Sequence, residues 1–171
     1  MKQNKYDDNV FFQKYSQMDR SVKGLEGAGE WKTLERLLPD FHDKHVLDLG
    51  CGFGWHCRYA AEHGAASVLG VDISAKMIAK ARSMGNEGII EYRCMPMEDI
   101  LLPEASFDIV LSSLAFHYTP DFQAVCRNVS RWLKPEGAFI FSVEHPVFTA
   151  QGTQDWHYDC LLYTSDAADD K

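Results

Sequence analysis

The sequence has no apolar run close to the roughly 20 residues that a membrane-spanning helix needs, so we expect no membrane partner. Its start, MKQNKYDDNVFF, has no apolar core of the kind found in secretory signals, so we expect a cytoplasmic protein. Positive charge is scarce: 17 Lys and Arg face 25 Asp and Glu, for a net charge of −8. Nucleic-acid binding requires basic patches, so we expect no nucleic-acid partner.

Cysteine gives no sign of a metal site or a disulfide framework. The chain has 5 cysteines, widely spaced, and no two of them form a Cys-x-x-Cys pair. This number and spacing fit neither a zinc centre nor a set of paired disulfides. We expect buried free thiols in a reducing compartment and no bound metal.

The chain does contain alternating strand and helix patterns, over 171 residues, the length of one domain. The patterns predict strands at 45–50, 67–72, 89–94, 107–113 and 138–143, and helices at 28–38, 55–63, 75–84 and from Thr119-Pro120 to a stop at Pro135 and Gly137. Ser74 is expected to cap the helix at 75–84. Short strand–helix connections predict a parallel sheet with right-handed crossovers, which binds ligands at the carboxyl ends of its strands.

Glycine recurs at every second position after the first predicted strand, in HVLDLGCGFGWH (45–56). Because Gly50, Gly52 and Gly54 cost backbone entropy, we expect a ligand to approach this backbone closely. The dinucleotide fingerprint G-x-G-x-x-G would place its third glycine at position 55, which is Trp55 here. The nucleoside-triphosphate loop G-x-x-x-x-G-K-[ST] does not occur in the sequence.

Five sequence features together resemble a known family. Asp48-x-Gly50-x-Gly52-x-Gly54 resembles motif I of the class I S-adenosylmethionine-dependent methyltransferases. Asp72 ends the second predicted strand, where an acid that holds a ribose belongs. The later motifs of the family resemble, in the same order, MPMEDI (95–100), FDIVLSSLAFHY (107–118) and LKPEGAFIFS (133–142), the last with Glu136 in place of the first glycine of L-K-P-G-G. The resemblance covers roughly residues 40–145.

The resemblance implies an α/β fold, a Rossmann-like, doubly wound and mostly parallel sheet, that uses S-adenosyl-L-methionine. It places Asp48 near the amino group of the cofactor, Asp72 on the ribose and Glu98 or Asp99 on the adenine. The full set of cofactor-binding residues that it implies is Tyr15, Asp48, Gly50, Cys51, Gly52, Asp72, Ile73, Met77, Met97, Glu98 and Ser113.

Four of these assignments have an alternative that the residues alone leave open. Asp48 could be a strand-end carboxylate bonded to loop amides, and Asp72 could be a charge at a helix N-terminus beside Ser74. Glu98 could be a solvated surface acid, and Met77 could belong to the core.

Methyl transfer from a sulfonium is an in-line displacement with a neutral leaving group, so the protein mainly orients and desolvates the reactants. A general base is needed only if the acceptor must lose a proton. His117 and His145 are the candidates, with Tyr118 and Glu144 beside them, because all four follow strands at the expected ligand edge. A structural role is the alternative for both histidines.

The resemblance also divides the chain. Residues 1–39 are expected to form a helical cap, in which Tyr15 or Met18 covers the cofactor. Trp31 lies on an apolar stripe with Leu34, Leu37 and Leu38, so we expect it to pack in the core, and a place in the cover over the cofactor is the alternative.

Residues 40–159 are expected to form the cofactor-binding core, without the C-terminal strands with which this fold ordinarily ends. The last residues, CLLYTSDAADDK (160–171), resemble a translated sequencing adaptor, so we expect a non-native tail. A natural disordered acidic tail is the alternative.

These observations predict a methyltransferase that acts on a small molecule. Basic stripes are lacking, and SSLAF (112–116) stands where an Asn-Pro-Pro-Tyr or Asp-Pro-Pro-Tyr motif would indicate a macromolecular acceptor. A module that binds the cofactor without transferring the methyl group, and a nicotinamide-dependent oxidoreductase, remain the alternatives. The sequence does not indicate an oligomeric state.

Overall fold

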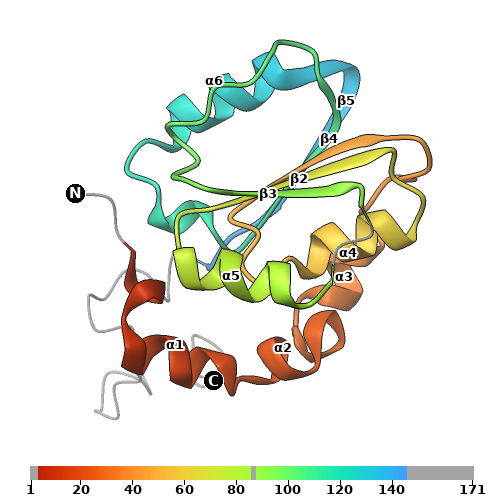
Figure 1. The fold of residues 1–171 in the computed structure, drawn as a ribbon. Coiled ribbons are helices and arrows are strands. Elements are labelled where there is room, and N and C mark those ends of the chain that lie inside the picture. The colour runs from red at the N-terminus through yellow and green to blue at the C-terminus, as the bar shows by residue number, and fades with distance from the viewer. Residues whose placement is uncertain (1–3, 86–87, 146–171) are drawn as a thin grey trace, which may run out of the picture.

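The computed structural model describes residues 4–85 and 88–145, which form a five-stranded parallel sheet with helices on both faces (Figure 1). The strands are β1 (His45–Leu49), β2 (Ser67–Asp72), β3 (Ile90–Cys94), β4 (Phe107–Ser113) and β5 (Leu133–Ser142), in the order β3-β2-β1-β4-β5. The order reverses at β1, so a ligand is expected above the carboxyl ends of β1 and β4. The predicted doubly wound α/β fold is confirmed.

Helices cover both faces of the sheet, and a helical segment precedes the first strand (Figure 1). The α-helices are α1 (Asn9–Ser16), α2 (Asp19–Val22), α3 (Trp31–Glu35), α4 (Trp55–Glu62), α5 (Ala75–Ser83) and α6 (Phe122–Trp132). Three short 3-10 helices are η1 (Lys5–Asp7), η2 (Gly24–Gly27) and η3 (Phe116–Tyr118). The helices α4 and α5 lie on one face of the sheet and α6 on the other.

Apolar side chains on both sides of the central strands explain this layering. Val46 belongs to the same buried cluster as Cys57 of α4 and Ile78 of α5, whereas Leu47 belongs to the cluster that contains Val129 of α6. The two clusters alternate along β1 because successive side chains of a strand point to opposite faces. Burial on both sides is typical of parallel strands.

The expected path of the chain between β4 and β5 is wrong in two places. The helix α6 begins at Phe122, after Asp121, whose side chain accepts a hydrogen bond from the Ala124 amide at 2.8 Å. Asp121 is thus the cap, not Thr119-Pro120. The strand β5 begins at Leu133 and contains Pro135, which fits because β5 is an edge strand of the described sheet.

The segment before β1 is helical, as predicted, and packs partly on α4. Trp31 is buried and its ring lies 4.8 Å from that of Tyr59, so its predicted core role is confirmed. Leu37, expected on the same stripe, is exposed because α3 ends at Glu35. Among the described residues, no helix is both long enough and apolar enough to cross a membrane.

The cysteines differ in exposure. Cys51 and Cys57 are buried free thiols, as expected, but Cys94 is exposed at the end of the edge strand β3. Cys160 and the whole tail at 160–171 lie outside the described residues.

Candidate functional site

The glycine loop joins β1 to α4 and is tied to β2. The amides of Gly50 and Cys51 both donate to the Val71 carbonyl, at 2.7 and 3.0 Å. Gly50, Gly52 and Gly54 all have positive φ, of 77°, 53° and 72°. Side chains rarely adopt this conformation, so the alternating glycines give the loop its path.

The three glycines nevertheless have different neighbours. A Cβ on Gly50 would lie 2.3 Å from the Cβ of Ala115, and one on Gly54 would lie 2.2 Å from the Tyr92 hydroxyl. A Cβ on Gly52 would meet no atom within 4 Å. Packing therefore requires glycine at positions 50 and 54, whereas the backbone at Gly52 faces open space.

That open space belongs to a pocket over the carboxyl edge of the sheet, with an empty volume of about 810 Å³, its mouth included. Most of the cofactor-binding residues predicted from the sequence line it: Tyr15, Gly50, Gly52, Asp72, Ile73, Met77, Met97, Glu98 and Ser113. They come from the N-terminal helices and from the ends of four strands, so the fold brings together residues that are far apart in the sequence.

Asp72 connects two parts of this pocket. Its Oδ2 accepts a hydrogen bond from the Gly52 amide at 2.9 Å, and its Oδ1 accepts one from the Ser74 amide at 2.8 Å. Burial raises the pKa of its carboxyl, whereas the two amide bonds lower it. Asp72 is thus the helix-end charge considered above and also a pocket residue.

Asp48 and Cys51 lie outside the pocket lining, unlike the other predicted cofactor contacts. Asp48 is 1% exposed, and its Oδ2 accepts a hydrogen bond from the Cys57 thiol at 3.3 Å. Burial is the main cause that raises the pKa of this carboxyl to about 7. Cys51 is buried as well, and burial raises its pKa to about 11. The Asp48 side chain therefore faces Cys57 of α4 and does not line the pocket.

The side of the pocket at β2 and β3 is mixed in character. Ile73 and Met77 line it with Met97 and Glu98, which follow β3. Met77 is also 2% exposed, and its amide donates to the Ser74 hydroxyl, the predicted cap of α5. The pocket and core roles of Met77 are therefore both present.

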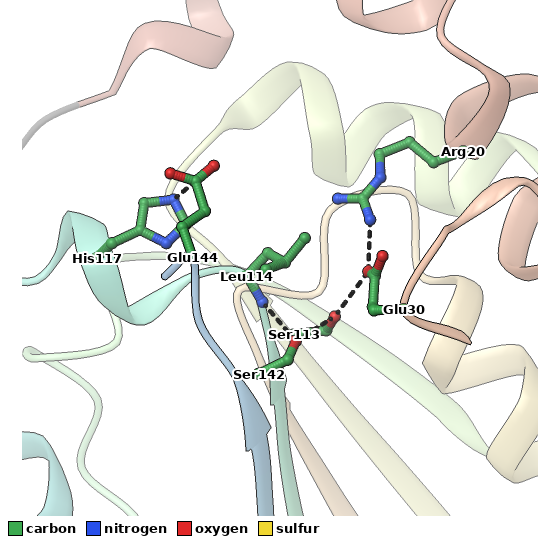
Figure 2. A network of polar contacts seen from close by, with 7 residues as sticks. All are labelled: Arg20, Glu30, Ser113, Leu114, His117, Ser142 and Glu144. Carbon is green, nitrogen blue, oxygen red and sulfur yellow. Dashed lines mark hydrogen bonds and ion pairs between the residues drawn. The ribbon is translucent and has the colours of Figure 1, made fainter. Parts of the chain in front are cut away.

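Neither histidine proposed as a general base lines the pocket. His117 lies in η3 with its Nε2 4.0 Å from Glu144 Oε1 (Figure 2), and its buried Nδ1 has no partner among the described residues. Burial lowers the pKa of His117, although the Glu144 charge opposes this. The neighbouring Tyr118 does line the pocket, and His145 is exposed.

The pocket residues that were not predicted include Tyr6 and Arg20. The hydroxyl of Tyr6 lies 3.1 Å from that of Tyr118, and Arg20 forms an ion pair with Glu30. Met18, the alternative to Tyr15 as a cover, is exposed and does not line the pocket. No local motif marks Tyr6 or Arg20, and only the expectation of an N-terminal cover points to their segment.

Comparisons with known proteins agree with this geometry. A family model described as a methyltransferase domain matches residues 47–141. The chain is similar to a Haemophilus influenzae protein of unassigned function (37% identity over 150 residues, 84% of this chain and 59% of that one). It is also similar to the ubiquinone biosynthesis O-methyltransferase of Neisseria meningitidis serogroup C (32% identity over 164 residues, 78% of this chain and 69% of that one).

Among solved structures, a proposed S-adenosylmethionine-dependent methyltransferase from Listeria monocytogenes is similar, with 53% identity and a TM-score of 0.73. The match covers 77% of this chain and 62% of that one. The chain thus spans about three fifths of the length of the Haemophilus and Listeria relatives. On the family model, these relatives and the shared five-stranded fold, the chain belongs to the class I S-adenosylmethionine-dependent methyltransferases.

Proposed function

We propose that the pocket binds S-adenosyl-L-methionine and that the protein transfers the methyl group to a small-molecule acceptor. The observation that carries the proposal is the glycine loop, whose Gly52 backbone faces open pocket space beside the Asp72 carboxylate. This combination suits a ligand that lies flat on backbone and offers hydroxyl groups to an acid.

Different residues of the pocket suit different parts of the cofactor. Asp72 can accept hydrogen bonds from ribose hydroxyls, and Glu98 can accept from an adenine amino group. Ile73 and Met77 offer apolar surface to an adenine ring.

Bound in this pocket, the cofactor supplies a methyl group on a sulfonium. The chain's own residues would orient the acceptor and exclude water, for which Tyr6, Tyr15 and Tyr118 are placed in the lining. If the acceptor is a hydroxyl or a thiol, a base must take its proton. His117 and His145 remain the candidates, although neither lines the pocket, and Glu144 Oε1 lies 4.0 Å from Nε2 of His117.

Two points support a small-molecule acceptor. The Neisseria relative carries the name of an O-methyltransferase of ubiquinone biosynthesis. The net charge of −8 opposes a nucleic-acid acceptor. The expected cytoplasmic location and the division into a cover (1–39) and a core (40–159) remain predictions.

Changing Asp72 tests the cofactor assignment. We expect Asp72→Ala to weaken S-adenosylhomocysteine binding by about 10- to 150-fold, because a charge-assisted contact contributes roughly 1.5–3 kcal/mol. Isothermal titration calorimetry measures the effect. Asp19→Ala, which removes an exposed carboxylate that bonds Lys23, should leave the affinity unchanged. Equal affinity of Asp72→Ala and the parent chain would contradict the role given to Asp72.

A further inference from the structure

A carboxylate joins the N-terminal segment, residues 4–16, to the start of α5. Asp7 ends η1, which lies against α5 (Figure 1). Its Oδ1 accepts hydrogen bonds from the Ser74 hydroxyl at 2.6 Å and from the Lys76 amide at 3.2 Å. The side-chain amide of Asn4 donates to Asp7 Oδ2 at 2.7 Å, and the Lys76 ammonium donates to Asn9 Oδ1 of α1. Three donors therefore hold the Asp7 carboxylate, and two of them lie at the N-terminus of α5.

The N-terminus of α5 suits a negative charge, because its first amides have no partner within the helix and carry partial positive charge. Ser74 caps the helix by accepting a hydrogen bond from the Met77 amide at 3.2 Å, and Asp7 takes up the Lys76 amide. Burial raises the pKa of the Asp7 carboxyl, but the hydrogen bonds that it accepts lower the pKa below its usual value. Asp7 is therefore held as a carboxylate at neutral pH.

The segment that Asp7 holds reaches across the pocket. Tyr6, the residue before Asp7, lines the pocket with Tyr15 of α1, and the centres of the two rings lie 5.2 Å apart. The Tyr6 hydroxyl lies 3.1 Å from the hydroxyl of Tyr118, a lining residue in η3 after β4. Ser74 follows β2, so the segment spans from the end of β2 to the end of β4, which lie on either side of β1.

Ser74 also connects Asp7 to the residue that we assign to the ribose. The Ser74 hydroxyl donates to Asp7, and the Ser74 amide donates to Asp72 Oδ1 at 2.8 Å. The other carboxylate oxygen of Asp72 accepts a hydrogen bond from the Gly52 amide. Asp7 is therefore bonded to the loop that carries the proposed ribose site, and this bond fixes the neighbouring Tyr6 relative to that site.

We propose that Asp7 is a positioning residue, which fixes the N-terminal segment on α5, thereby holds Tyr6 over the bound cofactor and slows the release of the cofactor. This inference rests on the proposed function. Asp7 itself does not line the pocket, so it acts through Tyr6. Loss of the Asp7 bonds would leave the pocket residues of the sheet in place and free the segment to move.

A purely structural role, in which Asp7 only completes the cap of α5, is the competing account. Loss of a helix cap lowers the stability of the whole chain. It would not change how fast a folded chain releases its ligand. The two accounts therefore differ in the dissociation rate of the ligand and not in the melting temperature.

The test measures dissociation of S-adenosylhomocysteine from the full chain by surface plasmon resonance. Asp7→Ala should raise the dissociation rate by at least about 10-fold, because it removes charge-assisted hydrogen bonds. Asp7→Asn keeps an oxygen that accepts the same bonds, so it should raise the rate by less than about 3-fold. Asp121→Ala is the matched control, because it removes the capping carboxylate of α6 on the other face of the sheet and should leave the rate unchanged.

A double substitution tests whether Asp7 acts through Tyr6. Tyr6→Ala alone should raise the dissociation rate, because it removes the ring over the pocket. Adding Asp7→Ala to Tyr6→Ala should then raise the rate by less than about 3-fold more, since two substitutions that remove one interaction are not additive. Fully additive effects would contradict an action through Tyr6.

Hydrogen exchange of the ligand-free chain tests the attachment of the segment without the cofactor. The amides of η1 and α1 should exchange at least about 10-fold faster in Asp7→Ala than in the parent chain, whereas those of β1 and β4 should not change. Equal exchange over η1 and α1 in the two chains would overturn the role of Asp7 in holding the segment.

The outcomes separate this inference from the proposed function. Failure of the parent chain to bind S-adenosylhomocysteine would overturn the proposed function, and hydrogen exchange would still decide whether Asp7 holds the segment. If the parent chain binds it, an unchanged dissociation rate in a folded Asp7→Ala chain would overturn the positioning role alone. Thermal melting identifies a variant that does not fold. If Asp7→Ala is unfolded, Tyr6→Ala decides, because an unchanged rate there would overturn the role given to Tyr6 and with it that of Asp7.

Discussion

Gly52→Val is expected to weaken S-adenosylhomocysteine binding by at least about 100-fold, the largest loss that we predict for one substitution in the pocket. A Cβ at this position meets no protein atom within 4 Å, so the new side chain would extend into space reserved for the ligand. Forcing a branched side chain into a filled site costs about 3 kcal/mol at the upper end of the usual range, which corresponds to about 150-fold in affinity. Calorimetry with S-adenosylhomocysteine measures the loss.

The backbone strain of this substitution needs its own control. Gly52 has φ of 53°, where a branched residue is unfavourable in any surroundings. Gly85 has φ of 98° and also has open space, but it does not line the pocket. Gly85→Val should therefore lower the melting temperature without weakening binding. Normal binding by a folded Gly52→Val chain would refute the claim that the ligand lies on this backbone.

The second large effect concerns stability and pH. Burial raises the pKa of Asp48 from 3.8 to about 7, so the folded chain favours the neutral carboxyl. The free energy of unfolding therefore falls as the pH rises from 3.8 to about 7, by about 4 kcal/mol over the whole range. Because Asn cannot ionise, Asp48→Asn should become more stable relative to the parent chain by about 2–3 kcal/mol between pH 5 and pH 8.

Urea unfolding of both chains from pH 5 to pH 8 gives the quantity to measure, which is the difference in the free energy of unfolding between Asp48→Asn and the parent chain. His56 titrates in the opposite sense, because burial lowers its pKa from 6.5 to about 4 and its stabilising effect is lost as the pH falls. Subtracting the two curves removes that contribution. The Cys57 thiol donates to the Asp48 carboxylate and so lowers the pKa of this group. Cys57→Ala should therefore raise the pKa of Asp48 and move the inflection of the curve of stability against pH to higher pH. A difference that stays level from pH 5 to pH 8 would contradict the account of Asp48.

The strands and the backbone path of the glycine loop were predictable because their causes are local. Apolar runs such as Val46 and Leu47 mark a buried parallel strand, and the alternating glycines mark a backbone with positive φ. Strand–helix alternation then brings the ends of β1 to β4 to one edge. For that reason Gly52, Asp72 and Glu98 could be placed around one pocket from the sequence.

Contacts set by tertiary packing could not be predicted. Asp48 lies in the expected motif, but the turn of its strand end toward Cys57 depends on how α4 packs. Arg20 and Tyr6 belong to a segment without a motif, and only the folded chain brings them to the strand edge. The start of α6 was misplaced because Pro120 and Asp121 both suit a helix N-terminus, and Asp121 provides the bonded cap.

The central claim is that the glycine loop holds an adenosyl amino acid and not a dinucleotide. Calorimetric titration of the chain with S-adenosylhomocysteine and, separately, with NADH tests this directly, because Asp72 could bind the ribose of either ligand. We expect saturable binding of S-adenosylhomocysteine and none of NADH. Binding of NADH with no binding of S-adenosylhomocysteine would contradict the account.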